Sequence, residues 1–548
     1  MSNLIDLLLP TLIFATIPLS NSPVWVSIDQ DYSTGGGFWD IDGNGFIDLC
    51  TSNGNDMAWN RNGIYYNSNG NLETNASWRS ADSGEFGHLY LGDVNNDGLM
   101  DMAVVFLGIG SIQGPTRIYR NQGNGLETNP YWLSADRYNS FDGALGDIDL
   151  DGDLDLAVAA GDGYNNILSP AKVYRNQQGV IDTIPCWRAN DSSPSDAIRL
   201  ADLDNDGDLD IIVGYRRKLS IYKNFVDSIE RNASWSVTRN LGWVIRLAVG
   251  DYDNDGWLDL AVASNGQLDD TNSVMVFHNQ NGVLETIPAF TMLKNPTYRY
   301  TSCVAWGDVN GDGFLDLAAG GWWEPVVVFE NRSGILDTTP TWSYNGGYNL
   351  VCETVLWGDV GNDHLRFEQE QKNGDGCRKL FYLTHFPIQF FHRVLIDNDT
   401  IPSSDYCFDP LTGWVAFRTA PAQNSNIVFE YEYSNYPDLA VTNWTRSVGN
   451  YLFANTTTSA IASHHPISSI NPIEVFPNPF FEQVIIKSNL KIGEKLRIYD
   501  ASGNLVKTLA SSHSITWNGK DEKDKRLPKG IYFIQGSSDL IKKKIVKI

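Results

Sequence analysis

Acidic side chains recur along this chain at a spacing that suits one chemistry, the binding of a hard cation. Six loops share the pattern Asp-x-Asp/Asn-x-Asp/Asn-Gly-x-x-Asp. Oxygen atoms from positions 1, 3, 5 and 9, with the backbone carbonyl of position 7, can surround one ion of the size of Ca²⁺. Glycine at position 6 allows the backbone reversal that this wrapping needs. The expected ligands are Asp40, Asp42, Asn44 and Asp48; Asp93, Asn95, Asp97 and Asp101; Asp147, Asp149, Asp151 and Asp155; Asp202, Asp204, Asp206 and Asp210; Asp251, Asp253, Asp255 and Asp259; and Asp308, Asn310, Asp312 and Asp316.

Calcium is the expected ion, and about six structural Ca²⁺ ions would be bound. Without an ion, the converging carboxylates would lie about 4–5 Å apart, and each like-charge pair would cost roughly 3–4 kcal/mol at an effective dielectric constant near 20. Magnesium is the poorer candidate because it prefers tighter octahedral geometry and keeps its waters. The loops differ from EF-hands because they lack Glu at position 12 and precede a β-rich run rather than a helix. The alternative, a set of Asp-Asn-Gly turns that bind nothing, explains six copies on a fixed period poorly.

The loops differ in their number of carboxylates. The third, fourth and fifth loops offer four carboxylates each, whereas the first, second and sixth offer three and one Asn, so tighter binding is expected in the former group. A degenerate seventh copy starts at Asp359, but Gly361 replaces a ligand and His364 replaces the glycine. We expect this seventh loop to bind an ion weakly or not at all.

Two other features keep step with the loops, which start 49 to 57 residues apart. An aromatic residue lies 15 to 18 residues before each loop, and a β-like run ending in an aromatic residue, one further residue and Asn follows it. The preceding aromatic residues are Trp25, Trp78, Trp132, Trp187, Trp235, Phe290 and Trp342. The Asn residues are Asn67, Asn121, Asn176, Asn224, Asn279, Asn331 and Asn455.

These repeats predict an all-β fold. The segments between the marks are short β-rich runs separated by turns, without a sustained helical period. A unit of about 50 residues with about four strands is typical of a propeller blade. We therefore predict a seven-bladed β-propeller over residues 23–455. Because residues 23–26 are a spare copy of the aromatic segment, they are expected to supply the outer strand of the last blade.

The seventh repeat is interrupted. Its loop breaks after Asp363 and resumes at Pro437-Asp438, which matches the segment after the other loops. Residues 364–437 are therefore a β-rich insertion within the last blade, because surface loops tolerate insertions. We expect a small β domain that projects from the propeller rim.

The repeats closely resemble the FG-GAP/VCBS repeat family, which includes the calcium-binding repeats of integrin alpha-subunit propellers and of many bacterial surface proteins. The resemblance covers residues 23–455 apart from the insertion. It implies a propeller with structural calcium in the blade loops. It implies adhesion or ligand binding less directly, because this fold hosts many functions.

The last part of the chain has a different character. Residues 473–548 contain 14 Lys and Arg against eight Asp and Glu, and their β-like runs predict an immunoglobulin-like β-sandwich after a linker, residues 456–472. This tail resembles the type A sorting domain of type IX secretion, on the residues Val475–Phe480, Ile498–Asp500 with Gly503, and Gly530–Tyr532. The resemblance implies recognition by the type IX secretion machinery and release or attachment at the bacterial outer membrane. The alternative is an ordinary immunoglobulin-like module.

Residues 1–22 contain an apolar run followed by small and polar residues, which is typical of a signal peptide. No Lys or Arg precedes the run, and the alternative is a short buried N-terminal segment. No other apolar run reaches the roughly 18 residues that cross a bilayer, so no transmembrane span is expected in the mature chain. The net charge of −26 argues against a nucleic-acid partner. We expect a secreted protein at the extracellular cell surface, attached to the outer membrane.

The six cysteines form no Cys-x-x-Cys pair, so a zinc site is not expected. In an exported chain some could form disulfides. The first candidate pair is Cys377 with Cys407, and the second is Cys303 with Cys352.

No HExxH, GxSxG or P-loop motif is present. The leading hypothesis is therefore a non-enzymatic adhesion protein or a binder of an extracellular glycan or protein. A second is a polysaccharide-degrading enzyme, a lyase or hydrolase, with His364, His385 and His392 near Tyr382 and Arg393 as a candidate site. A third is a structural cell-surface component. The aromatic marks are interpreted as blade packing, whereas the pair Trp322-Trp323 departs from the repeat and is either buried packing or an exposed binding pair.

Overall fold

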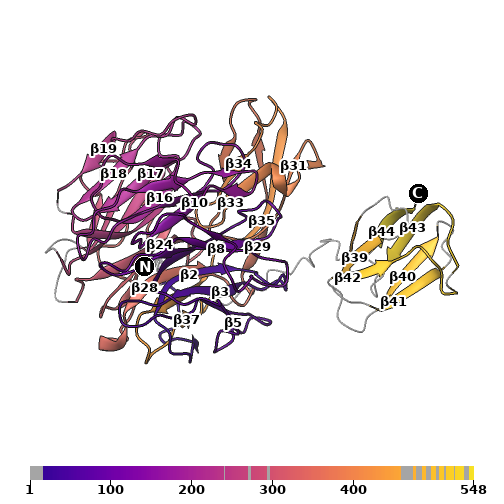
Figure 1. The fold of residues 1–548 in the computed structure, drawn as a ribbon, viewed down its shortest axis with the longest axis horizontal. Coiled ribbons are helices and arrows are strands. Elements are labelled where there is room, and N and C mark those ends of the chain that lie inside the picture. Colours follow the sequence, from indigo (N-terminus) through magenta and orange to yellow (C-terminus); the bar gives the residue numbers. More distant parts are fainter. Residues whose placement is uncertain are drawn as a thin grey trace, which may run out of the picture. The chain divides into compact units, whose positions relative to one another are not determined.

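The computed structural model describes residues 17–239, 241–268, 273–292, 297–457, 473–476, 484–488, 495–500, 505–510, 514–523, 525–535 and 542–547. Within these residues the regular structure is β-sheet, with two short 3₁₀ turns, and the all-β prediction is confirmed. In the same residues no helix is long and apolar enough to cross a membrane. The chain divides into two compact units, residues 1–458 and 459–548, which are described separately (Figure 1).

Seven four-stranded antiparallel sheets make up most of the larger unit, and we number them along the chain. Sheet 1 contains β2 (Ser33–Trp39), β3 (Asp48–Asn53), β4 (Gly63–Tyr65) and β5 (Trp78–Arg79), and sheet 2 contains β6 (Phe86–Gly92), β7 (Asp101–Phe106), β8 (Arg117–Tyr119) and β9 (Trp132–Leu133). Sheet 3 contains β10 (Gly143–Gly146), β11 (Asp155–Val158), β12 (Lys172–Tyr174) and β15 (Trp187–Arg188), with the hairpin β13 (Asn176–Gln177) and β14 (Val180–Ile181) beside it in sequence. Sheet 4 contains β16 (Ser195–Ala201), β17 (Asp210–Tyr215), β18 (Lys218–Tyr222) and β19 (Trp235–Val237), and sheet 5 contains β20 (Trp243–Gly250), β21 (Asp259–Asn265), β22 (Val274–Phe277) and β23 (Phe290–Met292). Sheet 6 contains β24 (Thr301–Gly307), β25 (Asp316–Gly321), β26 (Val326–Phe329) and β27 (Trp342–Tyr344), and sheet 7 contains β28 (Cys352–Gly358), β36 (Asp438–Asn443), β37 (Tyr451–Phe453) and β1 (Trp25–Val26).

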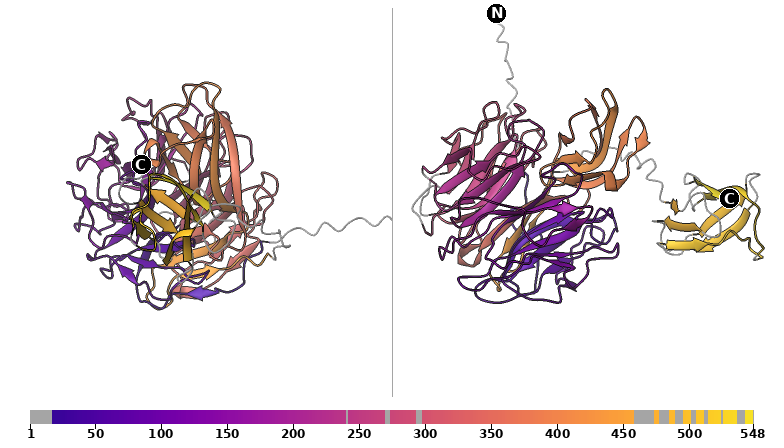
Figure 2. Two further views of the ribbon diagram at one scale, coloured as in Figure 1. Left: turned by 90° about the vertical axis from the view of Figure 1, so that its right-hand side faces the viewer. Right: turned by 45° about the horizontal axis from the view of Figure 1, so that its top comes forward.

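The seven sheets follow one another in a closed order. Each first strand contacts the first strand of the next sheet, from β2 through β6, β10, β16, β20 and β24 to β28, and β28 contacts β2. Figure 2 gives two further views of these sheets. The N-terminal strand completes sheet 7, with Trp25 opposite Leu452 and Val26 opposite Tyr451. The prediction that residues 23–26 supply the outer strand of the last repeat is confirmed.

Part of the predicted signal peptide packs against sheet 7. Leu19 forms an antiparallel bridge with Asn455, and both Ile17 and Leu19 are buried. The remaining residues of that prediction, 1–16, lie outside the described residues. The signal peptide stays a prediction, and within residues 17–22 Ile17 and Leu19 are the buried side chains.

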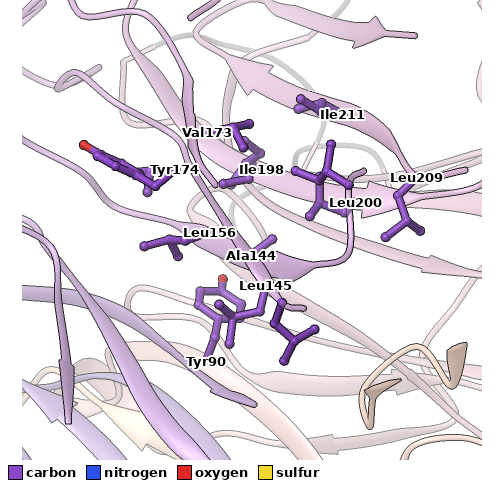
Figure 3. Packing of buried hydrophobic residues seen from close by; sticks show 14 of the residues in the cluster. Tyr90, Ala144, Leu145, Leu156, Val173, Tyr174, Ile198, Leu200, Leu209 and Ile211 are labelled. Carbon is purple, nitrogen blue, oxygen red and sulfur yellow. The ribbon is translucent and has the colours of Figure 1, made fainter. Parts of the chain in front are cut away.

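Neighbouring sheets pack so closely that five of the seven first strands end on glycine. A Cβ atom on Gly92 would lie 2.8 Å from Leu145 Cδ1, and one on Gly146 would lie 2.7 Å from Leu200 Cδ1 and 3.0 Å from Leu209 Cδ1. These leucines lie in the buried cluster shared by sheets 2, 3 and 4 (Figure 3). Real side chains do not approach so closely in a packed interior, so leucine side chains of the neighbouring sheet occupy the space that a Cβ atom would need.

The aromatic marks of the repeat meet across every sheet interface. Each outer-strand residue packs edge to face against the aromatic residue of the next sheet, with ring centroids 5.1 to 6.5 Å apart. This geometry is the one that aromatic quadrupoles favour. The pairs are Trp25–Tyr65, Trp78–Tyr119, Trp132–Tyr174, Trp187–Tyr222, Trp235–Phe277, Phe290–Phe329 and Trp342–Phe453. The interpretation of these marks as packing is confirmed.

The repeated Asn ties each Asp loop to the loop of the preceding sheet. Its backbone N–H donates to the position-9 Asp of its own loop at 2.6 to 3.0 Å. Its side-chain Nδ2 donates to the position-2 carbonyl of the preceding loop at 2.6 to 3.1 Å. The accepting carbonyls, from Asn67 to Asn455, belong to Val360, Ile41, Val94, Ile148, Leu203, Tyr252 and Val309. The seven bonds therefore run round the whole ring.

An ionic cluster is buried between the first strands. Asp142 lies 2.9 Å from Arg199 Nη1, 2.8 Å from Arg246 Nη1 and 3.1 Å from His88 Nδ1. Although burial opposes ionisation, the two guanidinium groups hold the pKa of Asp142 well below its usual range. Burial, followed by Arg246, lowers the pKa of His88 to about 4. His88 is thus a neutral residue with a structural role.

The insertion forms two small sheets of its own, which confirms its β character. One contains β29 (Leu365–Asn373), β35 (Asn426–Ser434), β31 (Ile388–Ile396) and β32 (Asp399–Thr400), and the other contains β30 (Leu380–Tyr382), β34 (Trp414–Phe417) and β33 (Tyr406–Asp409). The 3₁₀ turns are η1 (Gly347–Asn349), before β28, and η2 (Ser403–Asp405), within the insertion.

The sequence predicted that the insertion projects from the rim. In the structure it also packs against the Asp loops. Leu380 and Trp414 join the buried cluster of sheets 2 to 4, and the Asp202 N–H of the fourth loop donates to Tyr382 Oη at 3.1 Å. Lys379 Nζ donates to the Leu150 carbonyl of the third loop at 2.7 Å. The physical reason for the correction is that these apolar side chains need a partner surface, which the loops provide.

The smaller unit consists of two antiparallel sheets. One contains β38 (Ile473–Phe476), β39 (Val484–Ser488) and β42 (Ser514–Trp517), and the other contains β41 (Leu505–Ala510), β40 (Lys495–Asp500), β43 (Gly530–Gln535) and β44 (Lys542–Lys547). Side chains from both sheets, including Ile486, Ile498 and Trp517, share one buried cluster. Most of the predicted linker, residues 458–472, lies outside the described residues.

The first candidate disulfide is wrong. Cys377 is exposed, whereas Cys407 is buried with its Sγ 3.8 Å from Asp147 Oδ2, and both are free thiols. The second candidate pair is the one that the fold brings together, because Cys303 Sγ and Cys352 Sγ lie 3.4 Å apart across sheets 6 and 7. These two thiols are also free in the structure.

The Asn bonds between sheets predict a specific loss of stability. In Asn331→Ala, the buried carbonyls of Tyr252 and Leu315 lose donors at 2.7 and 3.0 Å. We expect the free energy of unfolding to fall by about 2–3 kcal/mol, because unsatisfied buried carbonyls keep their desolvation cost. Denaturant unfolding measures the change. The exposed Asn232→Ala is the control and should change it by less than about 0.5 kcal/mol; equal effects of the two variants would contradict the role of Asn331.

Candidate metal-binding loops

All Asp loops lie at one end of the ring, because each connects the first and second strands of its sheet. The six intact loops share one backbone conformation. The N–H of the position-6 glycine donates to the position-1 carboxylate at 2.7 to 3.0 Å, and that glycine has φ between +84° and +96°. The glycines are Gly45, Gly98, Gly152, Gly207, Gly256 and Gly313. The predicted backbone reversal at position 6 is confirmed, and it occupies the region that disfavours other residues.

The same turn gathers the candidate ligands. The position-5 side-chain oxygen accepts the N–H of position 7 at 2.9 to 3.2 Å, so each loop curls around its own carboxylates. Donor oxygens lie within 4.8 Å of one another in groups from the first, third and fourth loops. The groups are Asp40, Asp42 and Asp48; Asp147, Asp149 and Asp155; and Asp202, Asp204 and Asp206. The structure thus brings together side chains that the spacing selected.

The position-9 carboxylates are held mainly by the backbone. Asp48 accepts the N–H of Asn67 at 2.7 Å and that of Ile41 at 2.9 Å, and the same pair of bonds recurs at Asp316, from Asn331 and Val309. Sequence reasoning assigned this position to the ion alone and missed its structural role. The recurrent Asn was the signal that could have revealed it.

The electrostatics of the loops favour a cation. Burial raises the pKa of Asp48 to about 7 and those of Asp147 and Asp259 to about 8, and neighbouring carboxylates add to each shift. The position-3 residues Asp149 and Asp253 each keep one buried oxygen without a hydrogen-bond partner. Sets of oxygen donors of this kind fit Ca²⁺.

Basic side chains enter the three loops that have four carboxylates, a feature that the carboxylate count ignored. Arg175 Nη1 lies 2.6 Å from Asp149 Oδ2 in the third loop, and His278 Nε2 lies 3.3 Å from Asp253 Oδ2 in the fifth. In the fourth loop, Lys223 Nζ lies 2.6 Å from Asp204 Oδ2 and 2.7 Å from Asp210 Oδ2. Each is the residue between the repeated aromatic and Asn. Tighter calcium binding by these loops therefore stays a prediction, and the positive charges of Arg175 and Lys223 oppose it in the third and fourth loops.

The seventh loop is reassembled from both sides of the insertion. His364 N–H donates to Asp359 Oδ2 at 2.7 Å, as glycine does in the intact loops. After the insertion, Asp438 accepts the N–H groups of Asn455 and Val360 at 2.8 and 3.0 Å, which is the position-9 arrangement. Asp359, Asp363 and His364 also bring donor atoms within 4.8 Å. The sequence pattern predicted that the repeat resumes at Asp438, which lies 74 positions after His364, and the structure adds that Asp438 takes the position-9 role of the seventh loop.

The histidines of the alternative catalytic site have separate partners. His364 Nε2 lies 2.9 Å from the Thr457 carbonyl, His392 Nε2 lies 2.8 Å from Glu432, and His385 stacks on the Tyr433 ring at 3.9 Å. Arg393 is paired with Glu430 at 2.5 Å. Each of these side chains thus has a structural partner of its own, and these contacts do not join His364, His385, His392 and Arg393 in one hydrogen-bonded group.

Comparisons with known proteins identify two parts of the chain. A family model described as FG-GAP-like repeat matches residues 40–104, 202–262 and 251–319. A model described as secretion system C-terminal sorting domain matches residues 474–548. No curated protein matches the sequence. Among solved structures, the chain is similar to one from the crystal structure of BBS1N in complex with ARL6DN, with 12% identity, a TM-score of 0.42, and coverage of 74% of this chain and 94% of that chain.

The position of Lys223 predicts competition between its ammonium group and a bound ion. In Lys223→Met, we expect the metal-free protein to melt at a lower temperature and the rise in Tm on adding calcium to be larger than in the parent, because Asp204 and Asp210 lose their neutralising partner. Thermal melts in chelator and in calcium measure both values. Lys529→Met, an exposed lysine of the other unit, is the control. An unchanged calcium-induced shift would show that Lys223 does not oppose binding.

Proposed function

We propose that this chain, which carries FG-GAP-like repeats and ends in a secretion system C-terminal sorting domain, is a calcium-stabilised seven-bladed β-propeller that works as a non-enzymatic binding protein at the bacterial cell surface. The observation that carries the proposal is the set of six near-identical acidic loops around a closed ring of sheets. The sorting domain supports export through the type IX secretion machinery and attachment at the outer membrane.

The proposed domains follow the sequence boundaries. Residues 23–455 form the propeller, residues 364–437 the insertion, residues 456–472 the linker and residues 473–548 an immunoglobulin-like sorting domain. Residues 1–22 act in export, although the packing of Leu19 on Asn455 favours removal of fewer residues than the whole segment.

Calcium would be held by the carboxylate and amide oxygens of positions 1, 3, 5 and 9 in each intact loop. The ion would offset the burial and the neighbouring charges that raise the carboxyl pKa values, and it would hold the turn between the first and second strands. Since the repeated Asn links each loop to the next sheet, a rigid loop also supports the ring.

Binding is preferred to catalysis because the candidate catalytic histidines are engaged in separate structural contacts. A polysaccharide-degrading enzyme remains the alternative. Incubation of the purified protein with polysaccharides should release neither new reducing ends nor unsaturated uronates; sustained release of either would favour the enzyme. Ordered calcium-dependent self-assembly would favour a structural surface component.

Metal removal tests the calcium proposal. Elemental analysis of protein dialysed against micromolar calcium should find about six Ca²⁺ ions per chain, and millimolar calcium should raise Tm by at least about 10 °C over chelator, because each saturated site adds roughly 2–3 kcal/mol. Millimolar magnesium is the control and should raise Tm less. Equal melting with chelator and calcium, together with an absence of bound metal, would refute the proposal.

The tail predicts a transferable export signal. Fusion of residues 473–548 to a periplasmically exported reporter, in a bacterium with type IX secretion, should move the reporter to the surface or the medium. Fractionation and protease accessibility measure its location. A fusion that lacks β44, and therefore one strand of the four-stranded sheet, should stay in the periplasm. Equal export of both fusions would contradict recognition of the folded sorting domain.

A further inference from the structure

A cavity of about 630 Å³ opens at the end of the ring opposite the Asp loops. Its lining residues lie just before first strands, as Tyr32 and Val351 do, at the start of first strands, as Asp196 and Trp243 do, or after second strands, as Leu107 and Trp444 do. The Asp loops join the other ends of these strands. All seven sheets contribute to the lining. The volume is within the range of about 300–1,000 Å³ that is usual for small-molecule sites.

Aromatic side chains outside the repeat form the floor of this cavity. Trp322 stacks on Trp444 with ring centroids 5.7 Å apart and an angle of 23°, and it meets Trp243 edge to face at 5.9 Å. Tyr164 lies against Trp243 at 6.0 Å. Trp243, Trp322 and Trp444 lie at or beside the ends of strands of sheets 5, 6 and 7 and have no counterpart in the repeat; Trp243 and Trp322 belong to a buried cluster against which Trp444 packs.

One aromatic residue at the rim is both exposed and held in a strained conformation. Trp323 is 46% exposed and has φ of +59°, a region that L-residues with bulky side chains rarely occupy. Its N–H donates to the Leu350 carbonyl at 2.8 Å, which holds the backbone there. Such strain is concentrated at ligand-binding positions. Of the two alternatives for the Trp322-Trp323 pair, buried packing applies to Trp322 and exposure to solvent applies to Trp323.

Carboxylates outnumber cations in the wall. Asp196 is buried, and its oxygens accept the N–H groups of Trp243 Nε1 at 2.8 Å and Gly163 at 3.2 Å. Asp162 and Asp56 also line the cavity, with Arg446 as the only guanidinium or ammonium group among the lining residues. Each Asp196 oxygen accepts one hydrogen bond from the protein and can accept a second, which suits hydroxyl donors, and the carboxylates of the wall disfavour an anionic ligand.

We propose that this cavity binds a neutral oligosaccharide, whose sugar faces lie on Trp323 and the floor aromatics and whose hydroxyl groups donate to Asp196 and Asp162. Apolar ring faces beside a few fixed polar groups are the usual composition of a ligand site. This inference rests on the proposed function, because it identifies the ligand of the binding protein and the face that receives it. Uronic-acid and sulfated glycans are rejected by the acidic wall.

The test uses the full-length protein with calcium present. Cellohexaose, maltohexaose, laminarihexaose, mannohexaose and xylohexaose serve as neutral probes, and hexagalacturonate serves as the anionic probe. Tryptophan fluorescence and calorimetric titrations should detect binding of at least one neutral probe, at least tenfold tighter than that of hexagalacturonate. Binding of none of the neutral probes, or preference for the anionic probe, would overturn the proposal.

Two variants separate binding from folding. Trp323→Gly relieves the positive φ, so it should weaken the bound probe at least tenfold while leaving Tm unchanged or higher. Asp196→Asn should weaken it by a similar factor through the loss of an acceptor. Phe367→Ala is the control, because Phe367 is 53% exposed on the insertion and outside the cavity. Equal affinity of the parent and both cavity variants would place the sugar elsewhere and refute the site.

The outcome is independent of the calcium and export tests. A protein that shows calcium stabilisation and tail-dependent export but binds no neutral probe would contradict only the carbohydrate inference. Loss of calcium stabilisation with retained sugar binding would contradict only the proposed role of the loops.

Discussion

The repeated Asn follows the third strand of every sheet, and its hydrogen bonds connect the acidic loops with the ring of sheets. Its backbone N–H holds the last carboxylate of one loop, and its Nδ2 holds a carbonyl of the loop before it. Both acceptors are buried, so water cannot replace the donor. The conformation of each loop is therefore tied to the position of its neighbouring sheet.

The two ends of the ring differ in how closely their connections repeat from sheet to sheet. At the loop end, six copies of one acidic turn repeat nearly unchanged, because each must satisfy the same backbone bonds. At the other end, the connections differ from sheet to sheet, and Trp243, Trp322 and Trp444 meet there without any counterpart in the repeat. A scaffold that is uniform at one end and variable at the other can keep its stability while its ligand site changes.

The insertion couples its own folding to the loop end. Tyr382 and Lys379 bond to the fourth and third loops, and Trp414 is buried with sheets 2 to 4. Asp438, on its far side, completes the seventh loop. The insertion thus shields part of the acidic surface, and its closure brings Asp359 and Asp438 together across a long stretch of sequence.

The sequence by itself determined the repeated parts. Glycine at position 6, the spare strand around Trp25 and the resumption at Asp438 were all predictable, because each depends on local chemistry at a fixed spacing. Only the tertiary structure decided that Lys223 lies between Asp204 and Asp210, that Cys303 rather than Cys377 has a thiol neighbour, and that Trp322 stacks on Trp444. Each of these contacts joins side chains from different strands or sheets, and no local pattern states which way such side chains point once the sheets pack.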